Sequence, residues 1–270
     1  MSTQQAKQTR LREIGPGCWN LRAPFYILGG LINVGTHMSF IRLSSGKFVA
    51  VSAVDLDAEA KAEVDRLTAN GKNIESVLAT NPFHTMAFEP FYALYPDARY
   101  YGTPRHIRNI KTIPWAGSVA DDAVLKMYEP EIEMRIPAGA EFNDPKPEAT
   151  NHFSGLVVYH RASKTLLCDD CFSVHKDPNV LLRLATGATP NSIGFHWSLK
   201  NQALHKSPDA AKLFYGWMLS LVKDWYFENM CCAHGDGVMI GGARGALQVG
   251  LDKLKPSLDE FSVAHGGSKL

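Results

Sequence analysis

The sequence predicts an α/β protein built as a four-layer αββα sandwich, in which two β-sheets pack face to face between outer helices. Two observations lead to this fold class. Each half of the chain contains two strand-like runs joined by a tight turn, at 36–43 with 47–54 and at 154–160 with 164–170. Each half also contains an amphipathic helix whose apolar stripe has to be covered. We expect one shared edge of the two sheets to carry the functional loops.

The first half continues from its hairpin into alternating helices and strands. Residues 57–71 predict a helix, because Asp57 is a favourable N-cap and a buried stripe begins with Ala60 and Val64. Gly71 is expected to end this helix in the left-handed conformation. The elements expected after it are a strand at 74–80, a polar loop at 81–85, a helix over about 86–95 and a strand at 98–102.

The second half ends in two helices. A long helix is expected over about 208–228, with Ser207 as its cap and Pro208 in its first position. Its buried face is expected to carry the apolar residues at four-residue spacing, which are Leu213, Trp217, Leu221 and Trp225. A short strand then leads into the run CCAHGDG at 231–237, and a terminal helix over about 242–254 closes the chain.

The domain organisation that follows is simple. Residues 1–16 are expected to form a polar tail and residues 256–270 a second one. Between them, residues 17–255 contain no low-complexity linker and no repeat, so one domain is expected.

Composition argues against several classes of function. The 270 residues are 45% hydrophobic and 20% charged with a formal net charge of +1, which is typical of a globular protein that binds neither nucleic acid nor a membrane. No run approaches the roughly 18 apolar residues of a spanning helix. The polar N-terminus does not resemble a secretory signal, and an odd number of cysteines, five, is typical of a reducing compartment. We therefore expect a cytoplasmic protein, with organellar targeting left open.

The cysteines allow two interpretations. Cys168 and Cys171 form a C-x-x-C motif, and Cys231 and Cys232 precede a histidine, so a redox pair or a thiolate metal site is one hypothesis. The favoured interpretation is that these cysteines are small apolar residues on buried strands.

Three polar segments follow predicted strands and share a pattern. They are the loop NPFHT at 81–85, the run NHFSGLVVYHRASKTLLCDDCFS at 151–173, and CCAHGDG at 231–237. In order and spacing, over roughly residues 30 to 250, they resemble the metallo-β-lactamase superfamily. That superfamily has an H-x-H-x-D-H motif, a later histidine followed by a hairpin and G-D, and a late strand ending in H-G. The middle segment is the most specific, with Asp170 at a strand end followed by Phe172.

The resemblance implies a metal site. Imidazole and carboxylate ligands at strand ends suit a borderline metal ion, and His152, Asp170 and His234 match the middle histidine, the bridging aspartate and the late histidine of the superfamily. In the superfamily, the residues matching His152 and His234 serve different metal ions, so a single ion is not expected to reach both well. His84 is a candidate fourth ligand or a proton shuttle. Its neighbour in the C-D-D run, Asp169, is expected to face solvent or to cap a turn.

The first motif departs strongly from the superfamily pattern. Its four ligand positions become Asn81, Phe83, Thr85 and Met86, and His84 falls on a spacer position. The early I-D-T-G stretch is also replaced, by VSAVD around Ser52. The chain therefore resembles an atypical branch of the superfamily with a degenerate H-x-H-x-D-H motif.

Three functional hypotheses remain open. The first is a metal-dependent hydrolase with at most one ion, zinc before iron or manganese, and a water that attacks a small ester, lactone or thioester, with His84 and Asp170 as the catalytic residues. The second is a metal-free binding or scaffold protein of the same fold. The third is thiol chemistry at Cys168 and Cys171. A small-molecule ligand is expected in the first two, and the region 190–201 around His196 is expected to cover the pocket, with Phe195 and Trp197 as an apolar wall.

Overall fold

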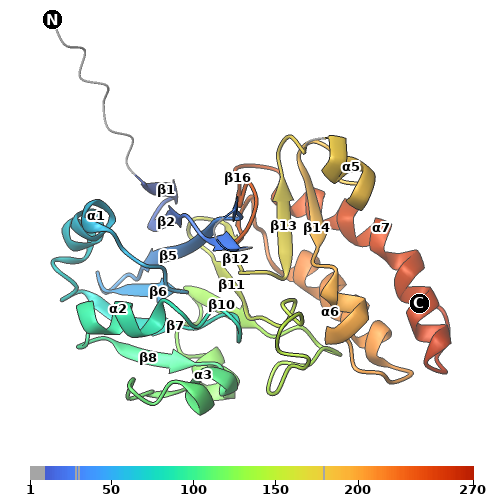
Figure 1. Ribbon diagram of the computed structural model, residues 1–270, viewed down its shortest axis with the longest axis horizontal. Coiled ribbons are helices and arrows are strands. Elements are labelled where there is room, and N and C mark those ends of the chain that lie inside the picture. Colours follow the sequence, from blue (N-terminus) through green and yellow to red (C-terminus); the bar gives the residue numbers. More distant parts are fainter. Residues whose placement is uncertain (1–9, 28, 30, 179) are drawn as a thin grey trace, which may run out of the picture.

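The strands form two large sheets, and Figure 1 shows these sheets between two sets of helices. The computed structural model describes residues 10–27, 29, 31–178 and 180–270. The first sheet has seven strands in the order β1 (Leu11–Gly15), β2 (Cys18–Ala23), β5 (Thr36–Arg42), β6 (Phe48–Val51), β7 (Ile74–Leu78), β8 (Arg99–Gly102) and β9 (Gly117–Ser118). The second has five strands in the order β10 (Ile132–Arg135), β11 (Val157–His160), β12 (Thr165–Leu167), β15 (Asn229–Cys231) and β16 (Val238–Met239).

Two small hairpins and the helices complete the described part of the chain. The hairpins pair β3 (Tyr26–Ile27) with β4 (Ile32–Asn33), and β13 (Phe172–His175) with β14 (Ser192–Phe195). The helices of the first half are α1 (Ala58–Thr68), α2 (Phe88–Leu94), α3 (Pro104–Asn109) and α4 (Asp122–Leu125). Those of the second half are α5 (Val180–Thr186), a π-helix at Leu199–Ala203, α6 (Ala210–Asp224) and α7 (Ala243–Ala264). No helix in the described residues is long and apolar enough to cross a membrane.

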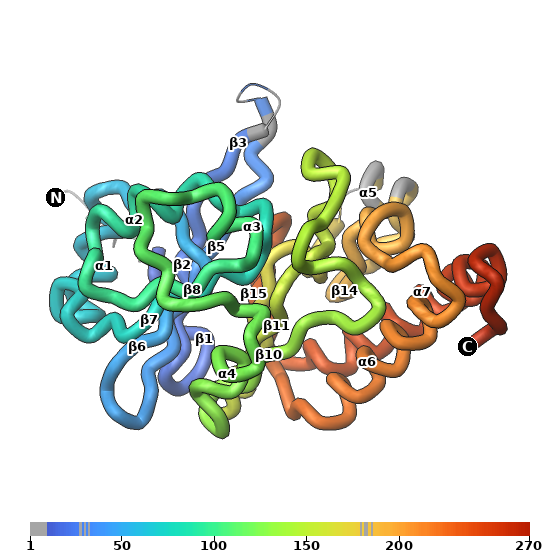
Figure 2. The backbone as a smooth tube through the Cα atoms, turned by 90° about the horizontal axis from the view of Figure 1, so that it is seen from below, coloured from blue at the N-terminus to red at the C-terminus, as the bar shows by residue number. Residues whose placement is uncertain are grey.

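Three apolar clusters define the four layers. A central cluster joins the inner faces of the two sheets, for example Val49 and Leu78 of the first with Val158 and Leu167 of the second. A second cluster covers the other face of the first sheet with α1 and α2. A third covers the other face of the second sheet with α6 and α7. Figure 2 shows the same separation, with α1 and α2 at one end and α6 and α7 at the other. The predicted αββα sandwich is confirmed.

Both predicted hairpins are present as antiparallel pairs, β5 with β6 and β11 with β12. The predicted N-cap of α1 is also confirmed, because the Asp57 carboxylate accepts a hydrogen bond of 3.0 Å from the amide of Ala60. The helix ends earlier than expected, at Thr68, because Ala69 already adopts the left-handed conformation. Gly71 is left-handed too, but it lies in the turn beyond the helix.

The buried face of α6 differs from the expected one by one position at its start. Leu213 is 54% exposed, whereas Phe214, Met218 and Leu221 are fully buried. A helix has 3.6 residues per turn, so residues four apart are not exactly aligned along its axis. A row of residues at strict four-residue spacing therefore turns gradually around the helix, and its first member lies off the buried face. Phe214 and Met218 therefore form the contact with the second sheet.

The two predicted tails are partly structured. Of the N-terminal tail, residues 1–9 lie outside the described residues, and Leu11–Gly15 forms β1, which pairs with β2. At the other end, α7 does not stop near 254 but continues through Pro256 to Ala264. Leu258 and Ser262 are buried on this extension because they prolong the apolar face that begins with Leu247 and Leu251. The boundary at 256 was therefore wrong as a helix end.

Candidate metal centre

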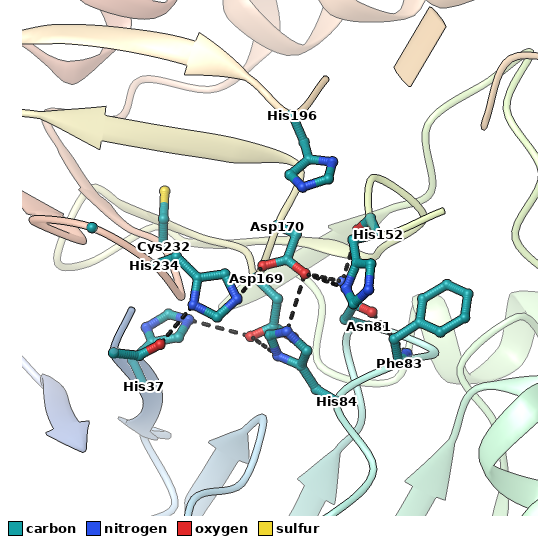
Figure 3. A network of polar contacts seen from close by, with 12 residues as sticks. His37, Asn81, Phe83, His84, His152, Asp169, Asp170, His196, Cys232 and His234 are labelled. Atoms are coloured by element: carbon teal, nitrogen blue, oxygen red, sulfur yellow. Dashed lines mark hydrogen bonds and ion pairs between the residues drawn. The ribbon is translucent and has the colours of Figure 1, made fainter. Parts of the chain in front are cut away.

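Loops that follow strands of both sheets meet at one edge of the sandwich and bring four predicted site residues together (Figure 3). His84 comes from the loop after β7, Asp170 from the segment after β12, and His234 from the loop after β15. His152 lies in the loop that precedes β11. The four residues are far apart in sequence, and the fold places their side chains in direct contact, as the following distances show.

Asp170 is the centre of this group, with a carboxylate that is 1% exposed. Its Oδ2 atom lies 3.1 Å from Nε2 of His84, 3.3 Å from Nδ1 of His152 and 3.3 Å from the amide nitrogen of Asn81. Its Oδ1 atom lies 3.1 Å from Nε2 of His234. His152 and His234 therefore contact different oxygens of one carboxylate.

Three of these residues have the geometry of a metal-binding set. The ligand atoms of His84, Asp170 and His234 all lie within 4.8 Å of one another. Zinc takes imidazole nitrogens and carboxylate oxygens at about 2.0–2.2 Å, so small side-chain adjustments suffice to place all three around one ion. No donor among the described residues is well aligned with Oδ1 of Asp170, although the atom is buried. A buried carboxylate oxygen without an aligned donor, beside an imidazole nitrogen, suits a cation between the two groups.

The ligand set predicted for a single ion was His152, Asp170 and His234, and the geometry favours His84 in place of His152. His84 and His152 both lie against Oδ2 of Asp170, but only the ligand atoms of His84 fall within 4.8 Å of those of both Asp170 and His234. His84 contacts Asp170 and also lies with its ring centre 5.5 Å from that of His234.

The charges of the site stabilise one another. Burial alone would lower the pKa of His84, but the adjacent carboxylates of Asp170 and Asp169 raise it well above its ordinary value. Burial opposes the ionisation of Asp170 as well, yet His84, His152 and His234 hold the pKa of that carboxyl well below its ordinary value. The pKa of His234 is raised in the same way, since the contact with Asp170 outweighs burial. Asp170 is therefore a carboxylate that attracts positive charge, whether from a proton or from a metal ion.

The side chain of Asn81 shapes the loop that carries His84. The Asn81 side chain donates to the backbone carbonyl of His152 at 3.0 Å, and its oxygen accepts from the amide of Phe83 at 2.8 Å. These bonds form a local turn that directs the following residue, His84, toward Asp170. The ring of Phe83 lies 5.0 Å from that of His152, and Met86 points outward, 75% exposed. The spacer position thus carries the imidazole that reaches the site.

Asp169 was expected to face solvent or to cap a turn, and this was wrong. It is 1% exposed, and its Oδ1 lies 3.4 Å from Nδ1 of His84 and 3.4 Å from Nε2 of His37. The expectation assumed that neighbouring strand residues point to opposite faces, but β12 already ends at Leu167. Outside the strand, Asp169 and Asp170 both point toward the ring of His84.

His37 and His106 were not singled out from the sequence. His37 lies on β5, 2% exposed, and His106 is fully buried with Nε2 3.1 Å from the carbonyl oxygen of His84. A usable signal existed for His37, because a histidine and Ser39 in an otherwise apolar buried strand need polar partners in the interior. Their partners could not be identified without the fold.

The region around His196 lies beside the site. The ring of His196 is 6.0 Å from that of His152, and His196 lines, together with Phe195 and Trp197, a cavity of about 810 Å³ between β14 and α7. The predicted apolar wall is thus part of a cavity. The three residues of the metal-binding set are not among its lining residues, so the cavity adjoins the site rather than containing it.

The cysteines are buried, all five of them, as the favoured interpretation expected. The sulfur of Cys168 lies 3.7 Å from that of Cys232, and the sulfur of Cys171 donates to the carbonyl of Phe153 instead. Burial raises the pKa of Cys171 and of Cys232 well above the ordinary value, which favours the protonated thiol.

Comparison with known proteins identifies the fold. No family model matches the sequence, and no curated protein matches it. Among solved structures, the DIM-1 metallo-β-lactamase is similar with a TM-score of 0.60 at 12% identity, over 94% of this chain and 100% of that one. The metallo-β-lactamase from Hirschia baltica has a TM-score of 0.57 at 12% identity, over 91% and 97%. The FIM-1 enzyme from Pseudomonas aeruginosa, solved in a mono-zinc form, has a TM-score of 0.58 at 8% identity, over 92% and 95%.

These likenesses and the layer order agree with the motifs found in the sequence. The chain has the metallo-β-lactamase fold. At such low identities the similarity concerns the fold alone, so the chemistry has to be argued from the side chains of this chain.

Proposed function

We propose that the protein is a metal-dependent hydrolase that acts on a small ester, lactone or thioester with one divalent ion at an atypical site. The observation that carries the proposal is the convergence of three ligand atoms, from His84, Asp170 and His234, within 4.8 Å of one another around a buried carboxylate. Two imidazoles and one carboxylate form a ligand set typical of zinc, with iron and manganese as alternatives.

The ion supplies Lewis acidity and a water of lowered pKa when it is bound. His84, Asp170 and His234 would hold it, and Asp170 would contribute the negative charge that offsets part of the ion's charge. Both ring nitrogens of His84 lie against carboxylates, so His84 serves better as a ligand than as the proton shuttle suggested from the sequence.

His152 is the better candidate for proton transfer. Its side chain is 35% exposed, and its Nδ1 lies 3.3 Å from Oδ2 of Asp170. An Nδ1 proton donated to Asp170 leaves Nε2 with the lone pair, ready to take a proton from water or from a substrate. Phe83, beside His152, and the guanidinium of Arg105, 5.0 Å above the Phe83 ring, would form one side of the substrate site.

A metal-free binding protein is the second candidate, and one observation favours it. Four nitrogen atoms, from His84, His152, His234 and Asn81, surround the carboxylate of Asp170 at 3.1 to 3.3 Å. The hydrogen bonds of Asn81, His84 and His152 to Oδ2, with the ion-pair contact of His234 at Oδ1, offset the cost of a buried charge without an ion.

The deciding experiment is metal analysis of protein purified without chelator and without a histidine tag. We expect close to one zinc, iron or manganese per chain in the wild type and in His205→Ala, which removes an exposed histidine from the segment before α6. We expect loss of that metal in Asp170→Ala. Hydrolysis of a nitrophenyl ester, a lactone and a thioester is then measured with and without added zinc. A metal content well below one ion per chain in the wild type, with the same content in Asp170→Ala, would support the metal-free binding protein and contradict the metal-dependent hydrolase.

A further inference from the structure

Asp169 is a buried carboxylate that contacts the site only through His84. Its Oδ1 lies 3.4 Å from Nδ1 of His84 and 3.4 Å from Nε2 of His37, and its Oδ2 accepts a short hydrogen bond from the hydroxyl of Thr80. The residue stands where the superfamily pattern G-D has glycine, so the resemblance assigns it no role.

The hydrogen-bond directions around His37 follow from its neighbours. The amide nitrogen of Asn20, a donor, lies 2.9 Å from Nδ1 of His37, so Nδ1 is the accepting nitrogen. The proton of His37 is therefore on Nε2, which lies 3.0 Å from the carbonyl oxygen of Cys168 and faces Asp169. His37 therefore donates to the carbonyl of Cys168, and the same nitrogen lies 3.4 Å from Oδ1 of Asp169.

Thr80 donates to Oδ2 of Asp169, and His37 lies beside Oδ1, so the remaining contact of Asp169 is with Nδ1 of His84. A carboxylate can only accept, so Nδ1 carries a proton that faces Asp169. The other ring nitrogen, Nε2, lies 3.1 Å from Oδ2 of Asp170, on the side where the proposed ion would lie (Figure 3).

His234 has the same arrangement with a different acceptor. Its Nδ1 lies 2.6 Å from the carbonyl oxygen of Gly35, and its Nε2 faces Asp170. Metal-binding histidines characteristically donate their second nitrogen to a carboxylate or a backbone carbonyl, which fixes the tautomer and the ring orientation. Both histidines of the set therefore have the outer partner that a ligand needs, and Asp169 is the partner of His84.

We propose that Asp169, held by Thr80 and contacted by His37, is the positioning residue that holds the ring of His84 at Nδ1 and so keeps Nε2 turned toward Asp170 and the metal centre. The role toward the ion rests on the proposed function, whereas the orientation of the ring does not. His84 aligns with a spacer position of the superfamily motif. Its ring contacts Asp170 through Nε2, and Asp169 provides the second contact, at Nδ1.

The test uses Asp169→Asn, which keeps the shape of the side chain and removes its charge. The matched control is Asp55→Asn, the same chemical change at an exposed carboxylate. Cobalt(II) binding is followed by its visible absorption and by competition with a chelator. We expect Asp169→Asn to bind one ion with about 10–100-fold lower affinity than the wild type, the range typical of a lost outer partner. We expect Asp55→Asn to bind like the wild type. Equal affinity in the two variants would overturn the proposal.

A second readout does not need the metal. In protein labelled with ¹⁵N-histidine, the resonances of His84 are assigned by their absence in His84→Gln. We expect Nδ1 to be protonated in the wild type, and the fraction of rings protonated there to fall in Asp169→Asn. An unchanged fraction would refute the positioning role. If the wild type binds no cobalt but this fraction falls, the metal-dependent function fails and the positioning role stands.

The variant His37→Gln covers the case in which Asp169→Asn does not fold. Loss of the His37 imidazole loosens the Asp169 carboxylate without changing its charge, so we expect the same two effects with a smaller size. Circular dichroism establishes that each variant is folded before its affinity is compared. A folded His37→Gln with wild-type affinity and a wild-type His84 spectrum would count against the proposal.

Discussion

The Nε2 atom of His84 lies 3.1 Å from Oδ2 of Asp170, although the two residues are 86 positions apart and His84 occupies a spacer position of its motif. The loop after β7 thus brings an imidazole to the carboxylate at the edge of the sandwich. The contacts of His84 and His152 differ, and they suit the two residues to different roles, metal ligand and proton-transfer group. His84 is enclosed between two carboxylates, whereas His152 lies at the exposed side of one of them.

The first prediction distinguishes these two histidines. We expect His84→Ala to lose more cobalt affinity than the ~10–100-fold that an outer partner contributes, because it removes a ligand. We expect His152→Ala to keep its affinity within about tenfold of the wild type and to lose about 10²-fold or more of any esterase activity, the size typical of a lost proton-transfer group. Affinities that fall in the opposite order would mean that His152 is the ligand.

The sequence predicted the layers of the fold well because they depend on local patterns. Turn residues and apolar runs predict the hairpins β5–β6 and β11–β12, and a capping side chain predicts the start of α1 at Asp57. The buried face of α6 and the end of α7 were predicted less well. The exposure of Leu213 and the length of α7 depend on the surface against which each helix packs.

Within the site, the sequence predicted the convergence of His84, His152, Asp170 and His234 but not their grouping. Grouping depends on the distances between the ring nitrogens around the carboxylate, and these are set by side-chain directions in the loops beyond the strands. The role of Asp169 could not be predicted for the same reason, since β12 ends at Leu167 and the alternation of a strand does not extend to Asp169.

The second prediction concerns the thiols. Cys168, Cys171 and Cys232 are buried, and their proximity to the site does not make them reactive. We expect none of the five thiols to react rapidly with Ellman's reagent in the native protein and all five to react in guanidinium chloride. Rapid titration of two native thiols, abolished in Cys168→Ala, would instead support thiol chemistry.

The third prediction concerns the extension of α7, which the sequence had suggested to be a polar tail. Leu258 of α7 is fully buried in the apolar cluster between the second sheet and the helices α6 and α7. Val263 on the same extension is 53% exposed. We expect Leu258→Ala to lower the free energy of unfolding by about 2–5 kcal/mol, because it leaves a cavity in the core. We expect Val263→Ala to stay within about 0.5 kcal/mol of the wild type in the same urea titration. Equal effects would show that the extension is not packed.

The last prediction concerns the acid sensitivity of the fold at a histidine outside the metal centre. His160 on β11 is 2% exposed, and its Nδ1 lies 2.8 Å from the hydroxyl of Ser163. Burial lowers the pKa of His160 from 6.5 to about 4, and Glu131 offsets only part of that shift. The folded protein therefore holds the neutral ring, and the unfolded chain takes up a proton first as the pH falls.

The sign of the effect follows from this difference. Above the unfolded pKa of about 6.5 the ring is neutral in both states, so its contribution is fully present; it is lost as the pH falls toward 4. His160→Asn keeps a polar group near Ser163 and cannot titrate in this range. We expect the free energy of unfolding of the wild type to fall more steeply than that of the variant between pH 6.5 and 4. The difference should reach up to about 3 kcal/mol, since one pKa unit corresponds to about 1.4 kcal/mol. Above pH 7 the two stabilities should differ by a constant amount that reflects packing alone. Parallel curves through the acid range would mean that His160 is already protonated in the folded state or accessible to water.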